Sequence, residues 1–304
     1  MERLNPVSVN HYPFRLGEDR NIIRQAVFAQ IEGLFDLFSL ERLQIVELLD
    51  CIKAYFSRAE GMFKFEEEAR GRGEEFATLY YHLVDHAVYQ ITFDAAATSI
   101  AILARGDVLS SHLTIEGAVA SLVGSMFHDT GYVSFPNSKN YAALLPVHVD
   151  KSVENVSKAV KEIGLPPFLN ENRVKTMAAL GVHNTYFPFT DDHKKYRARY
   201  TKYMSGEQRK EAYVVALTTQ FADLGGQIAR VDYFPNLLMD LRREFNAISY
   251  GFGTEIIGED LEMAAKSCAF IHNMVLPTVG RTGNAFFGTT NHNYAQAWYA
   301  PCLG

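Results

Sequence analysis

The stretch IEGAVASLVGSMFHDTGY, residues 115–132, carries the most informative pattern in the chain. Its apolar and small residues continue at helical spacing as far as Phe127, which predicts a buried helix over residues 115–128. His128 and Asp129 come at the end of that helix, and an unpaired charge in a low-dielectric interior is costly. A divalent metal ion is one partner that would satisfy both side chains, and Gly131 lets the chain turn away after them.

Helical periodicity extends from this stretch in both directions, and no segment shows the sustained apolar–polar alternation that is typical of a strand. We therefore expect an all-α fold. Glycine and proline fall mainly between the helical segments, where they act as breaks. The expected helices cover residues 20–56 with a break near 36–40, 76–104, 115–128, 151–163, 170–183, 206–230, 235–249 and 259–275.

The helical pattern divides the chain into three parts. Residues 1–70 are expected to form an N-terminal helical extension, residues 71–276 a metal-binding helical domain, and residues 277–304 an irregular C-terminal segment. The two helices of the extension would form a hairpin that packs either on the main body or on another copy of the chain, which would make a homo-oligomer. The charged run at residues 64–75 is expected to be a solvated helix end or a loop.

The composition argues against several classes of protein. With 29 Lys and Arg against 35 Asp and Glu, the formal net charge of −6 gives no bulk attraction for nucleic acid or an anionic membrane. The uncharged apolar stretch at residues 95–104 is too short to span a bilayer, and the N-terminal residues lack the apolar core of a secretory signal. The three cysteines form no CxxC pair, which argues against disulfides and a cysteine zinc site and favours a cytoplasmic location.

Further histidines and one aspartate lie in helical or helix-end contexts. His82 and His86 are four residues apart, so they share one face of a helix, about 6 Å apart along its axis. His148 precedes a predicted helix, His183 ends an apolar helix, and Asp223 lies on an apolar helical face. Taken singly, each of these side chains is more simply interpreted as an ordinary core or surface residue.

Taken together, these imidazoles and carboxylates form a set large enough to bind metal ions. Such a set suits zinc, iron, manganese or nickel, and it is too rich in nitrogen for calcium. Each candidate ligand lies on a different predicted helix or helix end. Because helical proteins place metals in the core of a bundle, we expect antiparallel helices to bring these side chains together.

Three segments resemble motifs of the HD superfamily of metal-dependent phosphohydrolases. MFHDTGY, residues 126–132, resembles the HD motif itself. YYHLVDHAVYQ, residues 80–90, resembles the YHNxxHAxxV segment of cyclic-nucleotide phosphodiesterases and their bacterial relatives, and FADLGGQ, residues 221–227, resembles their ADLSNP segment. The resemblance covers about residues 76–250 and implies an HD-type helical bundle, with the N-terminal helices as an extension.

The resemblance also implies a role for each matching residue. A first divalent ion would be bound by four residues: His86, His128, Asp129 and Asp223. A second ion would be bound by His148 and His183, with Asp129 bridging the pair, and His82 matches the histidine that acts as the general acid. The sequence departs from the pattern at Leu83, where the family has asparagine, and at VHVD (147–150), where it has NHE or HPE.

The activity that the resemblance implies is hydrolysis of a nucleotide-type phosphoester, such as a cyclic nucleotide, by a phosphodiesterase. Two divalent ions (Fe, Mn, Zn, Ni or Mg) would polarise the phosphoryl oxygens and activate water as a hydroxide, with Asp129 at the reacting centre and a protonated His82 supplying the leaving oxygen with its proton. The same ligand set also fits a different enzyme class, a di-iron oxygenase resembling inositol or phosphonate oxygenases. A third interpretation is a non-catalytic module that kept the metal site and associates through its N-terminal helices.

Overall fold

The computed structural model describes residues 20–71, 113–131, 147–186 and 198–226, together with several single positions between 262 and 273. These residues contain helices and no strand, so the predicted all-α class is confirmed. The helices are α1 (Arg20–Asp36), α2 (Arg42–Gly71), α4 (Ile115–Phe127), α5 (His148–Ile163), α6 (Glu171–Asn184) and α8 (Gly206–Gly226). The helices predicted at 76–104 and 235–249, and the segment 277–304, lie outside the described residues.

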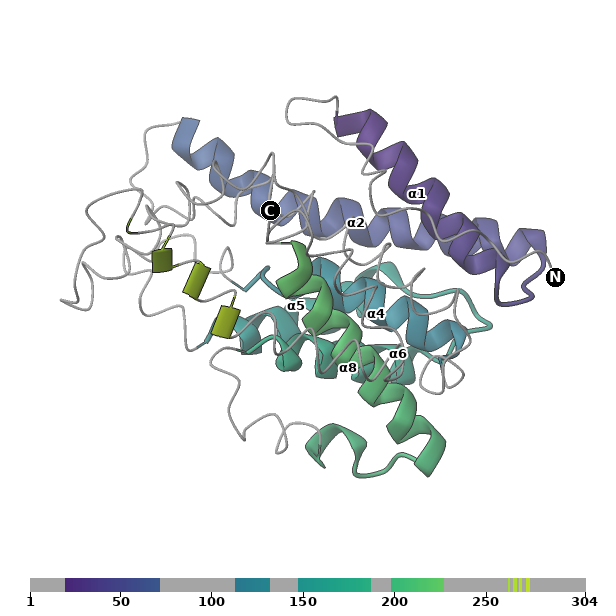
Figure 1. Cartoon of the computed structure of the whole chain (residues 1–304). Helices are drawn as coiled ribbons and strands as arrows, with labels where there is room; N and C mark the ends of the chain where they lie inside the picture. Colours follow the sequence, from purple (N-terminus) through teal and green to yellow (C-terminus); the bar gives the residue numbers. More distant parts are fainter. Residues whose placement is uncertain are drawn as a thin grey trace.

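The first two helices form the predicted hairpin. The break falls at residues 37–39, where Ser39 adopts a left-handed backbone conformation (φ 55°), and α2 continues into the charged run as far as Gly71. Figure 1 shows α1 and α2 side by side along one side of the group formed by α4, α5, α6 and α8. The Tyr55 hydroxyl donates to the Gly164 carbonyl at 3.0 Å, and the Tyr55 ring meets Phe127 edge-on, so the hairpin packs on the main body.

Capping residues explain where the central helices begin and end. The Thr114 side chain accepts from the Gly117 amide at the start of α4, and the Asn170 side chain accepts from the Arg173 amide at the start of α6. Gly164 ends α5 with a φ of 78°, a conformation that favours glycine. Helix α5 begins at His148, three residues before the predicted start, so this histidine lies on the helix instead of ahead of it.

Helices α4, α6 and α8 run in the same direction. At their N-terminal ends, the Glu211 carboxylate accepts from the Thr114 amide at 2.8 Å and pairs with Arg173. At the other end, His128 lies 3.4 Å from Asp223. The expectation that antiparallel helices bring the ligands together was therefore wrong for this pair, because only parallel neighbours place the C-terminal end of α4 beside the C-terminal part of α8.

Small residues bring these three helices together at one crossing. A methyl group on Gly181 of α6 would lie 2.5 Å from the Thr219 Oγ1 of α8. A methyl group on Gly124 of α4 would lie 3.2 Å from both that oxygen and the Ala178 carbonyl of α6. His128 and Asp223 each follow this crossing by four residues, which is about 6 Å along a helix axis. The crossing therefore brings the two candidate ligands to the same level.

The far end of the three-helix group is closed by an ionic cluster. Glu211 is 1% exposed, and its carboxylate is shared between the N-terminus of α4 and the Arg173 guanidinium. A carboxylate at a helix N-terminus interacts favourably with the partial positive charge there.

None of the helices in the described part of the chain combines the length and the apolar character that a membrane crossing would require.

Candidate metal centre

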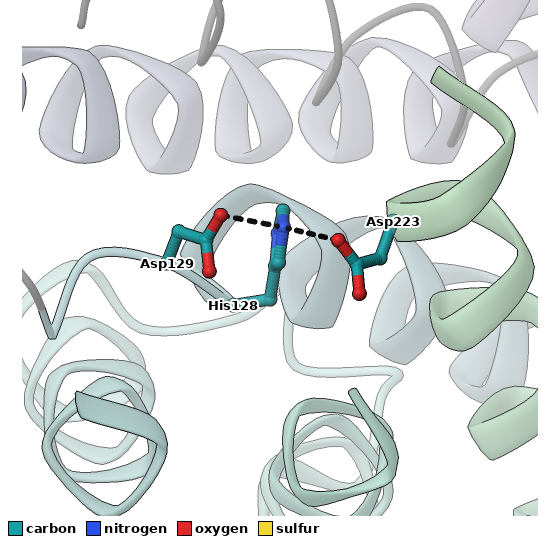
Figure 2. A group of neighbouring side chains, drawn as sticks. All are labelled: His128, Asp129 and Asp223. Carbon is teal, nitrogen blue, oxygen red and sulfur yellow. Dashed lines mark ion pairs between the residues drawn. The ribbon is translucent and has the colours of Figure 1, made fainter. Parts of the chain in front are cut away.

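Three of the predicted ligands come together in one group. The His128 Nε2 lies 3.1 Å from the Asp129 Oδ2 and 3.4 Å from the Asp223 Oδ1. Figure 2 shows the imidazole between the two carboxylates, with Asp223 reaching in from α8. One ligand atom from each residue lies within 4.8 Å of the other two, a spacing that allows all three to bind a single ion. His128 is 3% exposed and Asp129 is 8% exposed, so the group is shielded from solvent on most sides.

The orientation of the His128 ring is fixed from behind. Its Nδ1 lies 2.6 Å from the Ser125 carbonyl oxygen, one turn earlier in α4, so Nδ1 carries a hydrogen and donates it. In the neutral ring this leaves the lone pair on Nε2, the atom that faces the two carboxylates. Histidines that bind metals are commonly held in this way, with the far nitrogen donating to a carbonyl.

The two carboxylates of the centre favour the protonated, positively charged form of the imidazole between them. Burial lowers the pKa of His128, but the adjacent negative charges of Asp129 and Asp223 more than offset this and hold the pKa well above 6.5. The Nε2 nevertheless makes no hydrogen bond of good geometry within the described residues. A proton or a metal ion on the His128 Nε2 would offset the negative charge of the two carboxylates that face this atom. A divalent cation would balance the charge of both carboxylates. The donor set, one imidazole and two carboxylates, fits manganese, iron or zinc.

The backbone around the centre adds to its preference for cations. Helix α4 ends at Phe127 and α6 at Asn184, and the Gln220 side chain of α8 donates to the Asn184 carbonyl at 3.1 Å, three residues before Asp223. Helix C-termini carry partial negative charge from their free carbonyl groups. Because the three helices are parallel, their negative ends point toward the same region, which favours a bound cation there.

The turn that carries Asp129 is clamped to the start of α5. The Gly131 amide donates to the Ser152 Oγ at 2.8 Å, and the Asn155 side chain donates to the Thr130 carbonyl at 3.2 Å. A methyl group on Gly131 would lie 1.8 Å from the His148 carbonyl oxygen. Glycine is therefore required here by close backbone contact, and Gly131 is not among the described residues with positive φ.

The remaining predicted site residues divide into two groups. His148 is half-buried at the first position of α5, and His183 is 2% exposed near the end of α6. Neither belongs to the three-residue group, and the His183 Nε2 lies 3.8 Å from the Asp150 Oδ1. His82 and His86, the predicted general acid and fourth ligand, lie outside the described residues.

Several supporting residues were not found from the sequence. Ser152 and Asn155 follow His148 at positions i+4 and i+7, so the three share one face of α5. Polar side chains along an otherwise buried helix face could have indicated that this face of α5 hydrogen-bonds to another segment, here the turn at residues 129–131. The contact of the Tyr200 ring with His183, with ring centres 5.5 Å apart, had no comparable signal because the two residues are far apart in the sequence.

Comparison with known proteins adds no family assignment. The chain matches no protein-family model, no curated protein and no solved structure.

Proposed function

We propose that this chain is a metal-dependent phosphohydrolase of the HD type, and specifically a phosphodiesterase for a nucleotide-type phosphoester. One observation carries the proposal: the adjacent residues His128 and Asp129 meet Asp223, which is far from them in the sequence, with the spacing of metal ligands. The order of these residues, an adjacent His–Asp pair followed by a distant Asp, is the order that the HD resemblance implies.

Some residues of this centre would bind the ion, and others hold those ligands in position. His128 would donate its Nε2 lone pair to the ion, with its ring held by the Ser125 carbonyl, and Asp129 and Asp223 would supply oxygen ligands from either side. A bound divalent ion supplies Lewis-acid polarisation of a phosphoryl oxygen and a lowered pKa for water. The hydrogen bond from the Gly131 amide to the Ser152 Oγ would keep Asp129 in position to bind the ion.

A second ion is a separate part of the proposal. It would use His183 and His148, which lie at adjacent ends of α6 and α5, with Asp129 as the bridge. The start of α5 lies close to the end of α6 at this point, since the His183 Nε2 is 3.8 Å from the Asp150 Oδ1. Asp150 would therefore be a further carboxylate ligand for the second ion. His82 would protonate the leaving oxygen, as the resemblance implies.

Metal content and metal affinity test the binding part of this proposal. We expect purified protein to bind Mn²⁺ in isothermal titration, and Asp129→Asn and Asp223→Asn each to abolish the high-affinity ion while circular dichroism remains unchanged. His183→Ala would remove about one equivalent if a second ion is present. Asp50→Asn is the matched control, because Asp50 is an exposed carboxylate on α2 that pairs with Lys53. Equal Mn²⁺ binding by all variants would contradict the proposal.

Turnover tests the chemical part. The Mn²⁺-loaded protein would be assayed with bis(p-nitrophenyl) phosphate and with 2′,3′- and 3′,5′-cyclic nucleotides, and we expect activity that is lost in Asp129→Asn and retained in Asp50→Asn. The competing interpretation, a di-iron oxygenase, predicts two irons per chain and consumption of dioxygen with no release of phosphate or a monoester. That combination of results would replace the phosphohydrolase assignment.

A further inference from the structure

A short segment between α6 and α8 carries a cation next to an aromatic ring that contacts His183. Residues 198–201 form a single helical turn, and the Tyr200 ring lies against the His183 ring with centres 5.5 Å apart. The Arg199 guanidinium carbon lies 5.9 Å from the centre of the same Tyr200 ring. Through Tyr200, the cation of Arg199 is therefore tied to the C-terminal end of α6.

A chain of contacts links His183 to the turn that carries Asp129. His183 lies 3.8 Å from Asp150 in the first turn of α5, and the His148 carbonyl at the start of that turn contacts Gly131, two residues after Asp129. The segment is held in place from the other side, since the Arg209 Nε donates to the carbonyls of Thr201 and Met204. Arg199 consequently lies on a segment that is held both to His183 of α6 and to the first turn of α8.

The charge of Arg199 is available for a ligand. Other cations among the described residues are engaged by carboxylates: Lys151 pairs with Glu154, Lys210 with Glu207, and Arg173 with Glu211. Within the ranges that the structure describes, no carboxylate forms an ion pair with Arg199, whose residue is exposed. Within the described residues, the metal group offers an imidazole and two carboxylates and no cationic side chain, and a phosphate oxygen that does not touch a metal favours a cation nearby.

We propose that Arg199, positioned by Tyr200, is a specificity-determining residue that binds a phosphate oxygen of the substrate. The inference rests on the proposed function and deepens it, because it assigns the substrate an anionic phosphoester group that extends from the metal ligands toward His183. A planar guanidinium is well suited to phosphate, since its N–H groups can donate two parallel hydrogen bonds.

The chain contains a matched control three residues further on. Lys202 and Tyr203 repeat the pairing of a cation with an aromatic ring, with the Lys202 Nζ 5.1 Å from the Tyr203 ring centre. Tyr203 is 89% exposed, whereas Tyr200 is half-buried against His183. The two pairs are therefore similar in charge, and only the first is seated against a predicted site residue.

The test measures binding of inorganic phosphate to the full chain by equilibrium dialysis, with and without saturating Mn²⁺. We expect Arg199→Gln to raise the dissociation constant roughly tenfold, the usual order for loss of a charge-assisted hydrogen bond, and Lys202→Gln to leave it within twofold. Tyr200→Phe keeps the ring and should behave as the wild type, whereas Tyr200→Ala should weaken binding several-fold because Arg199 loses its support. With a hydrolysed substrate, Arg199→Gln should raise KM and leave kcat within twofold.

The outcomes separate this inference from the proposed function. Mn²⁺ content equal to that of the wild type in Arg199→Gln shows that the metal centre is intact, so a loss of phosphate binding is then due to Arg199. A wild-type protein that binds phosphate through Arg199 but hydrolyses no phosphoester would overturn the proposed function and leave this inference standing. Absence of phosphate binding by the wild type, or equal losses in Arg199→Gln and Lys202→Gln, would overturn the inference.

Discussion

Replacing Gly181 by alanine tests whether the three-helix crossing sets the geometry of the metal centre. The added methyl group would lie 2.5 Å from the Thr219 Oγ1, about 0.9 Å short of the 3.4 Å at which ordinary contact begins. Overpacking of this kind costs about 1–3 kcal/mol, while alanine in a helix interior gains about 1 kcal/mol over glycine. We therefore expect a net loss of about 1 kcal/mol in the free energy of unfolding.

Gly61→Ala is the matched control for this substitution. Gly61 lies inside α2 with no atom within 4 Å of the position that a methyl group would occupy, so only the helix-propensity gain remains and the variant should be more stable by up to about 1 kcal/mol. Urea denaturation followed by circular dichroism measures both changes. Gly181→Ala should also weaken Mn²⁺ binding roughly tenfold, because Asp223 follows Thr219 by one helical turn and would shift with it.

Second-site variants at Thr219 make the reasoning refutable. Thr219→Ala removes the clashing oxygen and leaves only the Thr219 Cβ, 3.1 Å from the new methyl group, so it should recover most of the stability lost in Gly181→Ala. Thr219→Val keeps the volume of the side chain and should recover none. If Gly181→Ala is as stable as Gly61→Ala, or if the two Thr219 variants behave alike, the crossing does not constrain the centre.

Three further substitutions test other parts of the structure. Glu211→Ala should cost about 3–5 kcal/mol, because it leaves a guanidinium without its buried carboxylate, whereas Glu207→Ala on the exposed start of α8 should change stability by less than about 1 kcal/mol in urea denaturation. In metal-free protein, the raised pKa of His128 stabilises the fold below about pH 6.5, and this contribution should disappear as pH rises through the folded-state pKa; a stability profile that is unchanged in His128→Gln would contradict this. Gly131→Ala places a methyl group 1.8 Å from the backbone carbonyl of His148, so it should abolish Mn²⁺ binding or folding, and a variant with normal Mn²⁺ affinity would show that the turn is not clamped.

The sequence predicted the helices better than their arrangement. Apolar spacing located the break between α1 and α2 and most of the boundaries of α4 and α6, because periodicity reports which residues of a helix are buried. Periodicity does not report the direction in which neighbouring helices run, and the parallel packing of α4, α6 and α8 was missed for that reason. The same limit applies to the Gly181–Thr219 contact, which depends on two residues 38 positions apart.

For the candidate site as well, the sequence indicated which residues could bind a metal better than it indicated how they are arranged in space. His128, Asp129 and Asp223 were identified from residue type and motif, and the structure brings them within 4.8 Å of one another. His148 and His183, which the resemblance assigns to a second ion, are not part of this three-residue group, and they lie at the start of α5 and near the end of α6. Residue type and motif therefore identified three candidate ligands that lie together, although Asp223 comes from a different helix and is about 95 residues away in the sequence.

The parallel arrangement accounts for the chemistry at both ends of the three-helix group. Helix N-termini carry partial positive charge and C-termini partial negative charge, so parallel helices make one end favourable to anions and the other to cations. Glu211 occupies the first end as a buried carboxylate at the start of α4. The second end holds Asp129 and Asp223, whose negative charges beside helix C-termini favour a cation between them, either the protonated His128 imidazole or a bound ion. An antiparallel group would cancel these dipoles, and the preference for a cation would then rest on the two carboxylates alone.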